Sequence, residues 1–257
     1  MTITRSTSQG KSSAKDKLIY RCSDDYGLIL VLENPRYRYL NFDSVFEQSG
    51  FNLARPYELV HEYTRIMLLV LGFVEPRHIT LLGLGGGSLL RSLHHYLSHC
   101  DFTQIELRQA VINVAINYFD VPNDERVTFI AEDALTALKD RTCDSTDIIF
   151  SDIYDAADMS SVQLAEAFLT QSERVLTKSG WLVINFHKLP DKHADFFVHL
   201  KSLFSCILIA PGEFNSHVLF AGKAHLPDLI NLQARATHLE QILGGNFANL
   251  VERVLVF

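Results

Sequence analysis

The sequence contains little cysteine and no segment that resembles a membrane span or a secretion signal. Its four cysteines, among 257 residues, lie far apart with no paired spacing, a pattern typical of neither a zinc site nor a disulfide framework. They indicate reduced thiols and therefore a cytoplasmic protein. No apolar run reaches the roughly 20 residues that cross a bilayer, and the N-terminal segment lacks the apolar core of a signal peptide. We therefore expect no membrane partner.

Positive charge is also in short supply. Lys and Arg number 23 against 30 Asp and Glu, which gives a net charge of -7. A general nucleic-acid binder needs a net positive surface, so we expect no nucleic-acid partner. An acidic surface suits a cationic substrate, although many enzymes with neutral substrates are acidic too. The hydrophobic share of 47% is ordinary for a globular protein with a sizeable core.

The first part of the chain divides into a tail and a small β-rich region. Residues 1–17 are rich in Ser, Thr and Lys and predict a disordered tail. Residues 18–54 predict a β-meander, because apolar runs alternate with turn residues. The expected strands are Leu18–Tyr20, Tyr26–Leu32 and Tyr37–Phe42. Arg55-Pro56 then predicts the start of an amphipathic helix that runs to about Gly72.

After Pro76, short apolar strands alternate with helices as far as about Ala221. Such an alternation predicts an α/β fold with a mostly parallel sheet and helices on both faces. The last two strands, 207–210 and 217–221, lie close together and predict an antiparallel hairpin. We therefore expect residues 55–257 to form a Rossmann-like domain. Ligands of such domains bind at the carboxyl ends of the strands, beside the switch in strand order.

A glycine-rich turn, Gly83-Leu84-Gly85-Gly86-Gly87, follows the first strand of this alternation and precedes a helix. Glycines allow a tight turn and a close approach of the backbone to a ligand. A plain structural turn or a dinucleotide site would use a similar segment. Glu106 then ends the next strand, about 20 residues later, where an acid can accept hydrogen bonds from ribose hydroxyls.

A second acid follows the third strand. Asp133-Ala134 stands where an acidic side chain can reach an adenine amino group, although a helix N-cap would explain Asp133 equally well. A glycine loop, an acid after the second strand and an acid after the third occur in this order in class I S-adenosylmethionine-dependent folds. We therefore expect the site to bind an S-adenosyl sulfonium nucleoside.

Two carboxylates, Asp152 and Asp155, follow the fourth strand with Tyr154 between them. The pair could neutralise an ammonium group, and one member could accept a proton from an attacking amine. Attack on the carbon next to a sulfonium needs a neutral lone pair, so a base is required. Two alternatives stay open. Asp155 could cap a turn and leave Asp152 alone at the ligand, and Tyr154 could line the acceptor pocket or cover the edge of the core.

From about Leu28 to Asn185 the chain resembles the spermidine/spermine synthase (polyamine aminopropyltransferase) family. The resemblance is carried by a glycine-rich segment that ends in Leu-Arg, here Gly83–Arg91, and by the family's D-x-x-D, here Asp152 to Asp155. It implies an aminopropyl donor, decarboxylated S-adenosylmethionine, a small-molecule amine acceptor and a homodimer. Asp152 is then the base, with Asp155 holding the ammonium end.

The same resemblance implies a set of donor-binding residues. Glu106 corresponds to the ribose-binding acid, and Asp133-Ala134 to the adenine-binding pair. Gln48 corresponds to a glutamine that contacts the cofactor. His61-Glu62 resembles the family's Tyr-His-Glu, with Val60 in place of the tyrosine.

The chain departs from the family's pattern at three further places. Gly86 stands where the family has an acid inside the glycine loop, which holds the amino group of the aminopropyl arm and repels the carboxylate of intact S-adenosylmethionine. Arg108 replaces a second acid after Glu106, and Ala156 replaces a proline. The departure at Gly86 leaves the identity of the transferred group open.

Three functions remain open at this point. The first is aminopropyl transfer to a polyamine-type amine. The second is methyl transfer from intact S-adenosylmethionine on the same fold, and the third is cofactor binding without catalysis. We expect no metal: His94, His95 and His99 lie at helical spacing, but no carboxylate or cysteine set accompanies them.

Overall fold

The computed structural model describes residues 16–42, 46–154, 161–225 and 229–257, and within it two β-sheets are present. The smaller is a four-stranded antiparallel meander in the order β1-β2-β3-β4. Its strands are β1 Lys17–Asp24, β2 Gly27–Glu33, β3 Tyr37–Phe42 and β4 Phe46–Asn52. The expected tail falls almost wholly on residues 1–15, which lie outside the described part of the chain. Lys17, the last residue of that prediction, belongs to β1.

The larger sheet has eight strands in the order β12-β10-β11-β9-β8-β5-β6-β7. Its strands are β5 His78–Leu82, β6 Asp101–Glu106, β7 Val127–Ala131, β8 Thr146–Ser151, β9 Leu176–Phe186, β10 Cys206–Pro211, β11 His217–Gly222 and β12 Leu255–Val256. Strands β9, β8, β5, β6 and β7 are parallel to one another, whereas β11, β10 and β12 are added in antiparallel pairs. The predicted fold class is therefore confirmed, including the C-terminal antiparallel hairpin.

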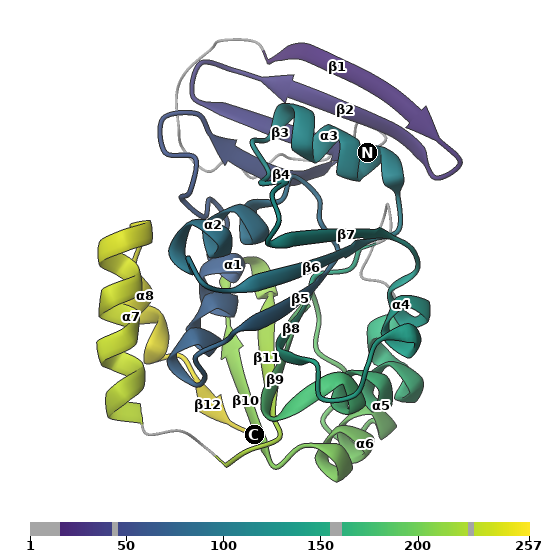
Figure 1. The fold of residues 1–257 in the computed structure, drawn as a ribbon. Helices are drawn as coiled ribbons and strands as arrows, with labels where there is room; N and C mark the ends of the chain where they lie inside the picture. The colour runs from purple at the N-terminus through teal and green to yellow at the C-terminus, as the bar shows by residue number, and fades with distance from the viewer. Residues whose placement is uncertain (1–15, 43–45, 155–160, 226–228) are drawn as a thin grey trace, which may run out of the picture.

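Helices cover both faces of this sheet (Figure 1). They are α1 Glu62–Met67, α2 Ser88–Tyr96, α3 Gln109–Tyr118, α4 Ala134–Asp140, α5 Glu166–Val175, α6 Asp195–Leu203, α7 Leu229–Leu243 and α8 Phe247–Val251, with 3-10 turns η1 Leu68–Gly72, η2 Ser161–Leu164 and η3 Glu213–Asn215. One core unites the meander with α1, α2, α3, α7 and α8, and the other packs α4, α5 and α6. Adjacent residues of β8 alternate between them: Ile148 and Phe150 lie in the first core and Ile149 in the second. This alternation is why the strands read as continuous apolar runs.

Two expectations for the N-terminal part are wrong. The helix predicted from Arg55 begins only at Glu62 and continues as a 3-10 turn. The side-chain oxygen of Asn52 accepts hydrogen bonds from the backbone N–H groups of Ala54 and Arg55, at 3.1 and 3.2 Å, and this local turn competes with helix formation. The meander also has a fourth strand, β4, which is too polar to show an apolar run.

The C-terminal helices α7 and α8 were not assigned from the sequence beyond their inclusion in residues 55–257. In the structure α7 packs against η1, and α8 packs against α7 and α1. The division of the chain into domains at residues 54 and 55 stays a prediction.

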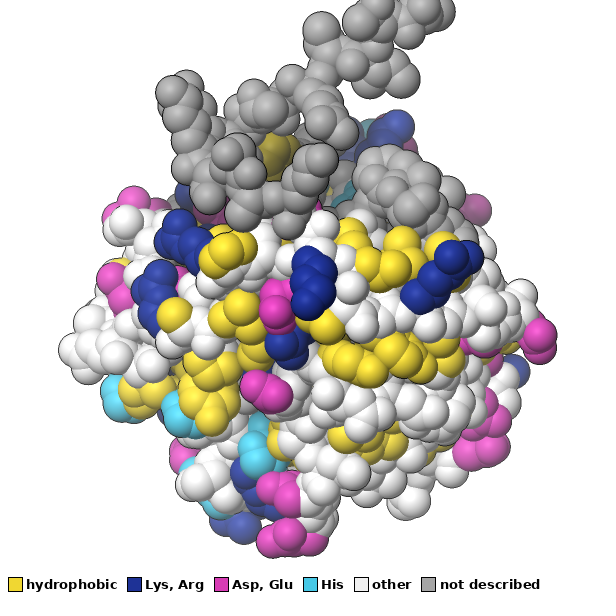
Figure 2. Space-filling model, turned by 90° about the horizontal axis from the view of Figure 1, so that it is seen from above, with side chains coloured by type: hydrophobic (Ala, Val, Ile, Leu, Met, Phe, Trp, Pro, Cys, Tyr) yellow, Lys and Arg dark blue, Asp and Glu magenta, His cyan; other side chains and the backbone are white. Residues whose placement is uncertain are grey.

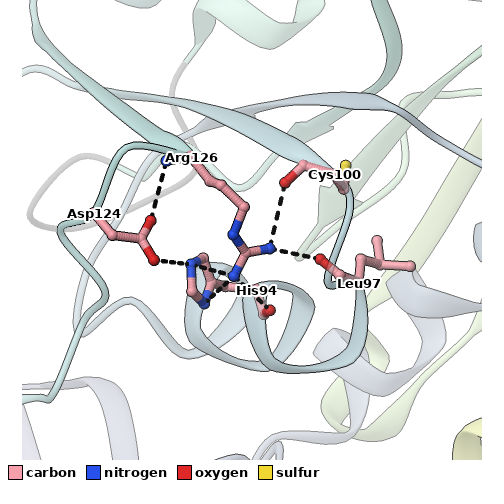
Figure 3. A network of polar contacts seen from close by, with 5 residues as sticks. All are labelled: His94, Leu97, Cys100, Asp124 and Arg126. Carbon is pink, nitrogen blue, oxygen red and sulfur yellow. Dashed lines mark hydrogen bonds and ion pairs between the residues drawn. The ribbon is translucent and has the colours of Figure 1, made fainter.

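Arg126 closes the C-terminal end of α2 (Figure 3). Its guanidinium donates hydrogen bonds to the carbonyls of Leu97 and His94, at 2.7 and 3.3 Å, so it satisfies carbonyls that a helix end leaves free. The His94 ring in turn lies 2.8 Å from the Asp124 carboxylate. This histidine therefore ties α2 to the loop before β7.

Seen from the side on which the meander lies, the surface bears hydrophobic side chains interspersed with Lys and Arg (Figure 2). Leu18 and Ile19 of β1 are 50% and 37% exposed, and Tyr26 in the turn after β1 is 55% exposed. Among the described residues, no helix has the length and apolar character that spanning a membrane requires.

Candidate active site

The glycine loop lies at the switch point of the large sheet. The chain passes from β5 outward to β6 and β7, then returns to place β8 on the other side of β5. Gly83 adopts a φ of +85°, and a β-carbon there would lie 2.3 Å from the carbonyl oxygen of Asp152. This position therefore requires glycine both for its backbone conformation and for the close approach of the segment that follows β8. The loop and Asp152 are thereby held side by side.

Gly86 has no room for a side chain. A β-carbon at this position would lie 2.9 Å from Cβ of Ser49 and 3.2 Å from the Phe119 ring. Ser49, 6% exposed, comes from β4 of the meander. The space from which an acidic side chain at residue 86 would extend is thus occupied by the meander.

We expect Gly86→Ala to lower the free energy of unfolding by about 1–3 kcal/mol, because it overpacks this contact. The matched control is a cycle with Ser49→Gly, in which the Gly86→Ala substitution should be less destabilising once the serine is removed. Chemical denaturation measures both steps. An alanine variant as stable as the wild type would show that the loop has room for a side chain.

Glu106 ends β6 and is bound by two backbone donors of the site. One carboxylate oxygen accepts a hydrogen bond from the N–H of Leu84 in the glycine loop, at 3.0 Å, and the other from the N–H of Arg108, also at 3.0 Å. Removal from solvent raises the pKa of the Glu106 carboxyl, and these two N–H groups offset part of that effect. Each oxygen still has a lone pair for a ligand hydroxyl.

Arg108 joins the site to the meander. Its guanidinium donates to both carboxylate oxygens of Asp24, at 2.8 and 3.0 Å, and to the carbonyl of Gly27. Its charge is therefore already paired within the protein.

Asp133 and Ala134 begin the helix after β7. The carboxylate of Asp133 accepts hydrogen bonds from the backbone N–H and the hydroxyl of Thr136, at 2.9 and 3.1 Å. Asp133 is therefore the N-cap of α4, as one of the two sequence interpretations predicted. Both residues also line the cavity described below, so the capping role does not remove Asp133 from the site.

Asp152, directly after β8, is held between two neutral donors. The amide of Asn185 donates to one carboxylate oxygen at 2.9 Å, and the hydroxyl of Tyr63 donates to the other at 3.1 Å. Removal from solvent raises the pKa of Asp152, while these two hydrogen bonds lower it in part. Burial and the nearby Asp152 raise the pKa of Tyr63 well above its ordinary value, so its hydroxyl remains a donor at neutral pH.

A buried glutamine, Gln163, holds the backbone on both sides of Asp152 through hydrogen bonds. Gln163 accepts a hydrogen bond from the Ser151 hydroxyl at 2.6 Å and donates to the carbonyl of Ile153 at 3.1 Å. The Tyr154 hydroxyl donates to the carbonyl of Asn185 at 3.3 Å, and its ring lies 4.3 Å from that of His187. Asp155, the second acid predicted from the sequence, lies outside the described residues.

Of the groups described above, one cavity of about 1010 Å³ is lined by Tyr63, Gly83, Glu106, Asp133, Ala134, Asp152 and Tyr154. Gly86 and Asn185 are not among its lining residues. The lining also includes Gly85, Gly87 and His61. Burial lowers the pKa of His61, and the nearby positive charge of Arg65 lowers it further. Gln48 belongs to β4, but its side chain lies outside the described part of the structure. The described lining includes five carboxylates, namely Glu106, Glu132, Asp133, Asp152 and Glu213. The single Lys or Arg in that lining is Arg108, so the cavity favours a cationic ligand.

The two residues that donate hydrogen bonds to Asp152 were not predicted. Tyr63 lies within the amphipathic helix that the sequence predicts from Arg55 to about Gly72, and nothing in that pattern marks its hydroxyl. Asn185 is a polar residue near the end of the apolar strand β9, at the same sheet edge as Asp152, and this position could have identified it. Among the described residues, no group of three or more potential metal ligands was found. The expectation of a metal-free site stays a prediction.

Comparisons with known proteins identify relatives over most of the chain. Residues 60–205 match the model of the spermine/spermidine synthase domain. The polyamine aminopropyltransferase of Neisseria meningitidis is 29% identical over 228 residues, which cover 86% of each chain. That of Chromobacterium violaceum is 28% identical over 232 residues, covering 87% of this chain and 88% of the relative.

Solved structures share the fold at lower identity. A probable spermidine synthase from Corynebacterium glutamicum has a TM-score of 0.73 at 16% identity and covers 91% of this chain and 95% of its own. Human methyltransferase-like protein 13, in complex with SAH, has a TM-score of 0.63 at 20% identity and covers 72% of this chain and 93% of its own. Both show the same fold.

Proposed function

Because the chain belongs to the spermine/spermidine synthase family, we propose that it transfers an aminopropyl group from decarboxylated S-adenosylmethionine to a polyamine-type amine. The observation that carries this proposal is the Asp152 carboxylate, held by Tyr63 and Asn185 beside the glycine loop. A carboxylate with a raised pKa at the switch point of the sheet is suited to accept a proton from an amine.

The donor's nucleoside would lie over β5, β6 and β7. We propose that the donor packs closely against the backbone of the glycine loop. Glu106 would bind the ribose hydroxyls, and Asp133 and Ala134 would contact the adenine. Gln48 and His61 would complete the donor site. The fit is supported by a cavity of about 1010 Å³, which lies at the upper end of the usual range for ligand sites.

The proposed reaction forms one bond and breaks another. A neutral acceptor nitrogen attacks the aminopropyl carbon next to the sulfonium, a C–N bond forms, the C–S bond breaks, and methylthioadenosine leaves with the sulfur's electron pair. Asp152 receives the proton that the acceptor nitrogen loses. Asp155 would hold the ammonium end of the acceptor, and Tyr154 would line its pocket.

Methyl transfer from intact S-adenosylmethionine is the second candidate, and Gly86 is the observation that favours it. No acid stands at this position to repel a donor carboxylate. Against it stands the charge of the cavity: its described lining has five carboxylates, and its one guanidinium is paired with Asp24. A carboxylated donor would have to bind in this anionic environment without a free cation among those residues.

Isothermal titration with both donors tests the proposal. We expect tighter binding of the decarboxylated donor, and the release of methylthioadenosine in single-turnover reactions with a panel of amines. A preference for the carboxylated donor with release of S-adenosylhomocysteine would favour methyl transfer. Binding of a donor with no product from any amine would favour a protein that binds the cofactor without catalysis.

Tyr63→Phe should move the acid limb of the pH–rate profile to higher pH. The tyrosine hydroxyl stabilises the ionised form of Asp152, so its removal raises the pKa of a carboxyl that burial has already raised. Because the base must be ionised, kcat/KM would then begin to fall at a higher pH than in the wild type. An unshifted acid limb would show that Asp152 does not titrate in this step, and Tyr154→Phe serves as the matched control.

We also propose that the protein acts in the cytoplasm, as a homodimer and without a metal. All four cysteines lie in the described part of the chain and none forms a disulfide there, which suits a reducing compartment. The homodimer rests on the family resemblance.

A further inference from the structure

The turn between β1 and β2 of the meander reaches the cavity at its nucleoside end. Tyr26, in this turn, belongs to the cavity lining together with Glu106, Leu107 and Arg108. Glu106 ends β6, and β5 separates β6 from β8. This end of the cavity therefore lies about 10 Å across the sheet from Asp152, which follows β8. The β1–β2 turn adjoins the place proposed for the donor's nucleoside and not the reacting end.

Arg108 holds this turn against the end of β6. Its guanidinium donates to both carboxylate oxygens of Asp24, at 3.0 and 2.8 Å, and to the carbonyl of Gly27 at 3.0 Å. Asp24 in turn accepts a hydrogen bond from the backbone N–H of Tyr26 at 2.9 Å. The backbone N–H of Arg108 donates to the Glu106 carboxylate. Arg108 thus connects the carboxylate proposed to bind ribose with the residues on both sides of Tyr26.

The guanidinium of Arg108 is itself engaged within the protein. Arg108 is buried, and its charge is paired with Asp24. Its Cζ atom lies 4.7 Å from the centre of the Phe42 ring and 6.0 Å from that of the Tyr26 ring. A planar guanidinium suits such contacts with aromatic rings. Its influence on a ligand therefore passes mainly through the residues that it holds.

The Tyr26 ring, in contrast, contributes little to the core. Tyr26 is 55% exposed, whereas Ile29, Val31 and Leu40 of the neighbouring strands are fully buried. The fold thus keeps a large aromatic ring at the wall of the cavity without burying it. Aromatic side chains in such positions pack well against nucleobases, because every base has a flat π-face.

We propose that Tyr26 packs against the adenosyl group of the donor, and that Arg108 and Asp24 position it there. This inference rests on the donor binding of the proposed function, and not on which group is transferred. The ring supplies apolar contact beside Glu106, and binding removes part of its exposed surface from water. Tyr26 is then a donor-binding residue that belongs to the meander, and Arg108 is a positioning residue that acts through it.

Titration calorimetry with methylthioadenosine tests the contact, because this ligand has the adenosyl group and lacks the transferred group. We expect Tyr26→Ala to weaken its binding about tenfold, within the range for loss of an aromatic ring from a base. Tyr26→Phe keeps the ring and should restore most of that affinity. Tyr57 is 41% exposed and lies outside the cavity lining, so Tyr57→Ala is the matched control. Unchanged affinity in Tyr26→Ala would overturn the contact.

Asp24→Ala tests the positioning role. Asp24 lies outside the cavity lining, so its loss affects the nucleoside only through Arg108 and the turn. Because methylthioadenosine is uncharged, the freed charge of Arg108 has little effect by itself. We expect binding to weaken about fivefold, the upper range for an ion pair that keeps contact with water. In the double variant with Tyr26→Ala, the loss should stay at about tenfold. Effects that multiply to about fiftyfold would overturn the positioning role.

Turnover of the same proteins distinguishes this inference from the proposed function. A wild type that transfers an aminopropyl group, with unchanged methylthioadenosine affinity in Tyr26→Ala, rejects the inference alone. Weaker binding in Tyr26→Ala, in a protein that transfers no aminopropyl group to any amine, supports the contact and rejects the proposed function. A wild type that neither binds methylthioadenosine nor turns over rejects both.

Discussion

Replacing Asp152 with asparagine should lower turnover by about a thousandfold, within the range for the loss of a general base. The physical reason is that an amide cannot accept the proton which the acceptor nitrogen must lose. The surroundings of Asp152 suit the substitution. An asparagine oxygen can still accept the hydrogen bond from Asn185, and the tyrosine hydroxyl, which both donates and accepts, can bind the new amide group. Stopped-flow or single-turnover assays of methylthioadenosine release measure the effect.

Donor affinity is the decisive companion measurement for this variant. We expect the dissociation constant of the donor to stay within about tenfold of the wild type, or roughly 1.4 kcal/mol. Its melting temperature should also be close to that of the wild type, because the hydrogen bonds around residue 152 are retained. Loss of donor binding instead would identify Asp152 as a donor ligand first, and the base would then have to be sought elsewhere in the cavity.

The order of strands and helices was predictable because it depends on local patterns. A continuous apolar run such as that of β8 is required because the strand has one face in each core. Glycine is required at position 83 because a side chain there would collide with the backbone of Asp152. The helix expected from Arg55 failed because a single side chain, Asn52, captures the backbone in a turn. That competition is decided by geometry and not by composition.

The candidate site was predictable where its residues stand at the carboxyl ends of strands. Glu106 and Asp152 both do, and the structure brings them to one cavity. Tyr63 and Glu213 come from a helix and from a hairpin tip, and their positions depend on long-range packing of α1 against the sheet. Gly86 illustrates the same limit. The sequence reveals that position 86 lacks an acid, but only the fold reveals that Ser49 of the meander occupies the space a side chain there would need.

Glu106→Ala should weaken donor binding about a hundredfold, or close to 3 kcal/mol, because hydrogen bonds to a charged acceptor each contribute about 1.5–3 kcal/mol. The substitution also leaves the N–H groups of Leu84 and Arg108 without their acceptor, so the free energy of unfolding should fall by about 2 kcal/mol. Titration calorimetry and chemical denaturation measure the two effects separately.

The pH dependence of donor binding gives an independent test of the same residue. Burial raises the pKa of Glu106, so it takes up a proton at a higher pH than a free glutamate, and donor affinity should fall as the pH is lowered through that raised value. In Glu106→Ala this decline should be largely lost. Glutamine is not a neutral replacement, because its amide group would face one of the two backbone donors that now bind the carboxylate. A donor affinity that is unchanged in Glu106→Ala and independent of pH would mean that the ribose is bound by other groups, and the nucleoside would then have to lie elsewhere than over β6.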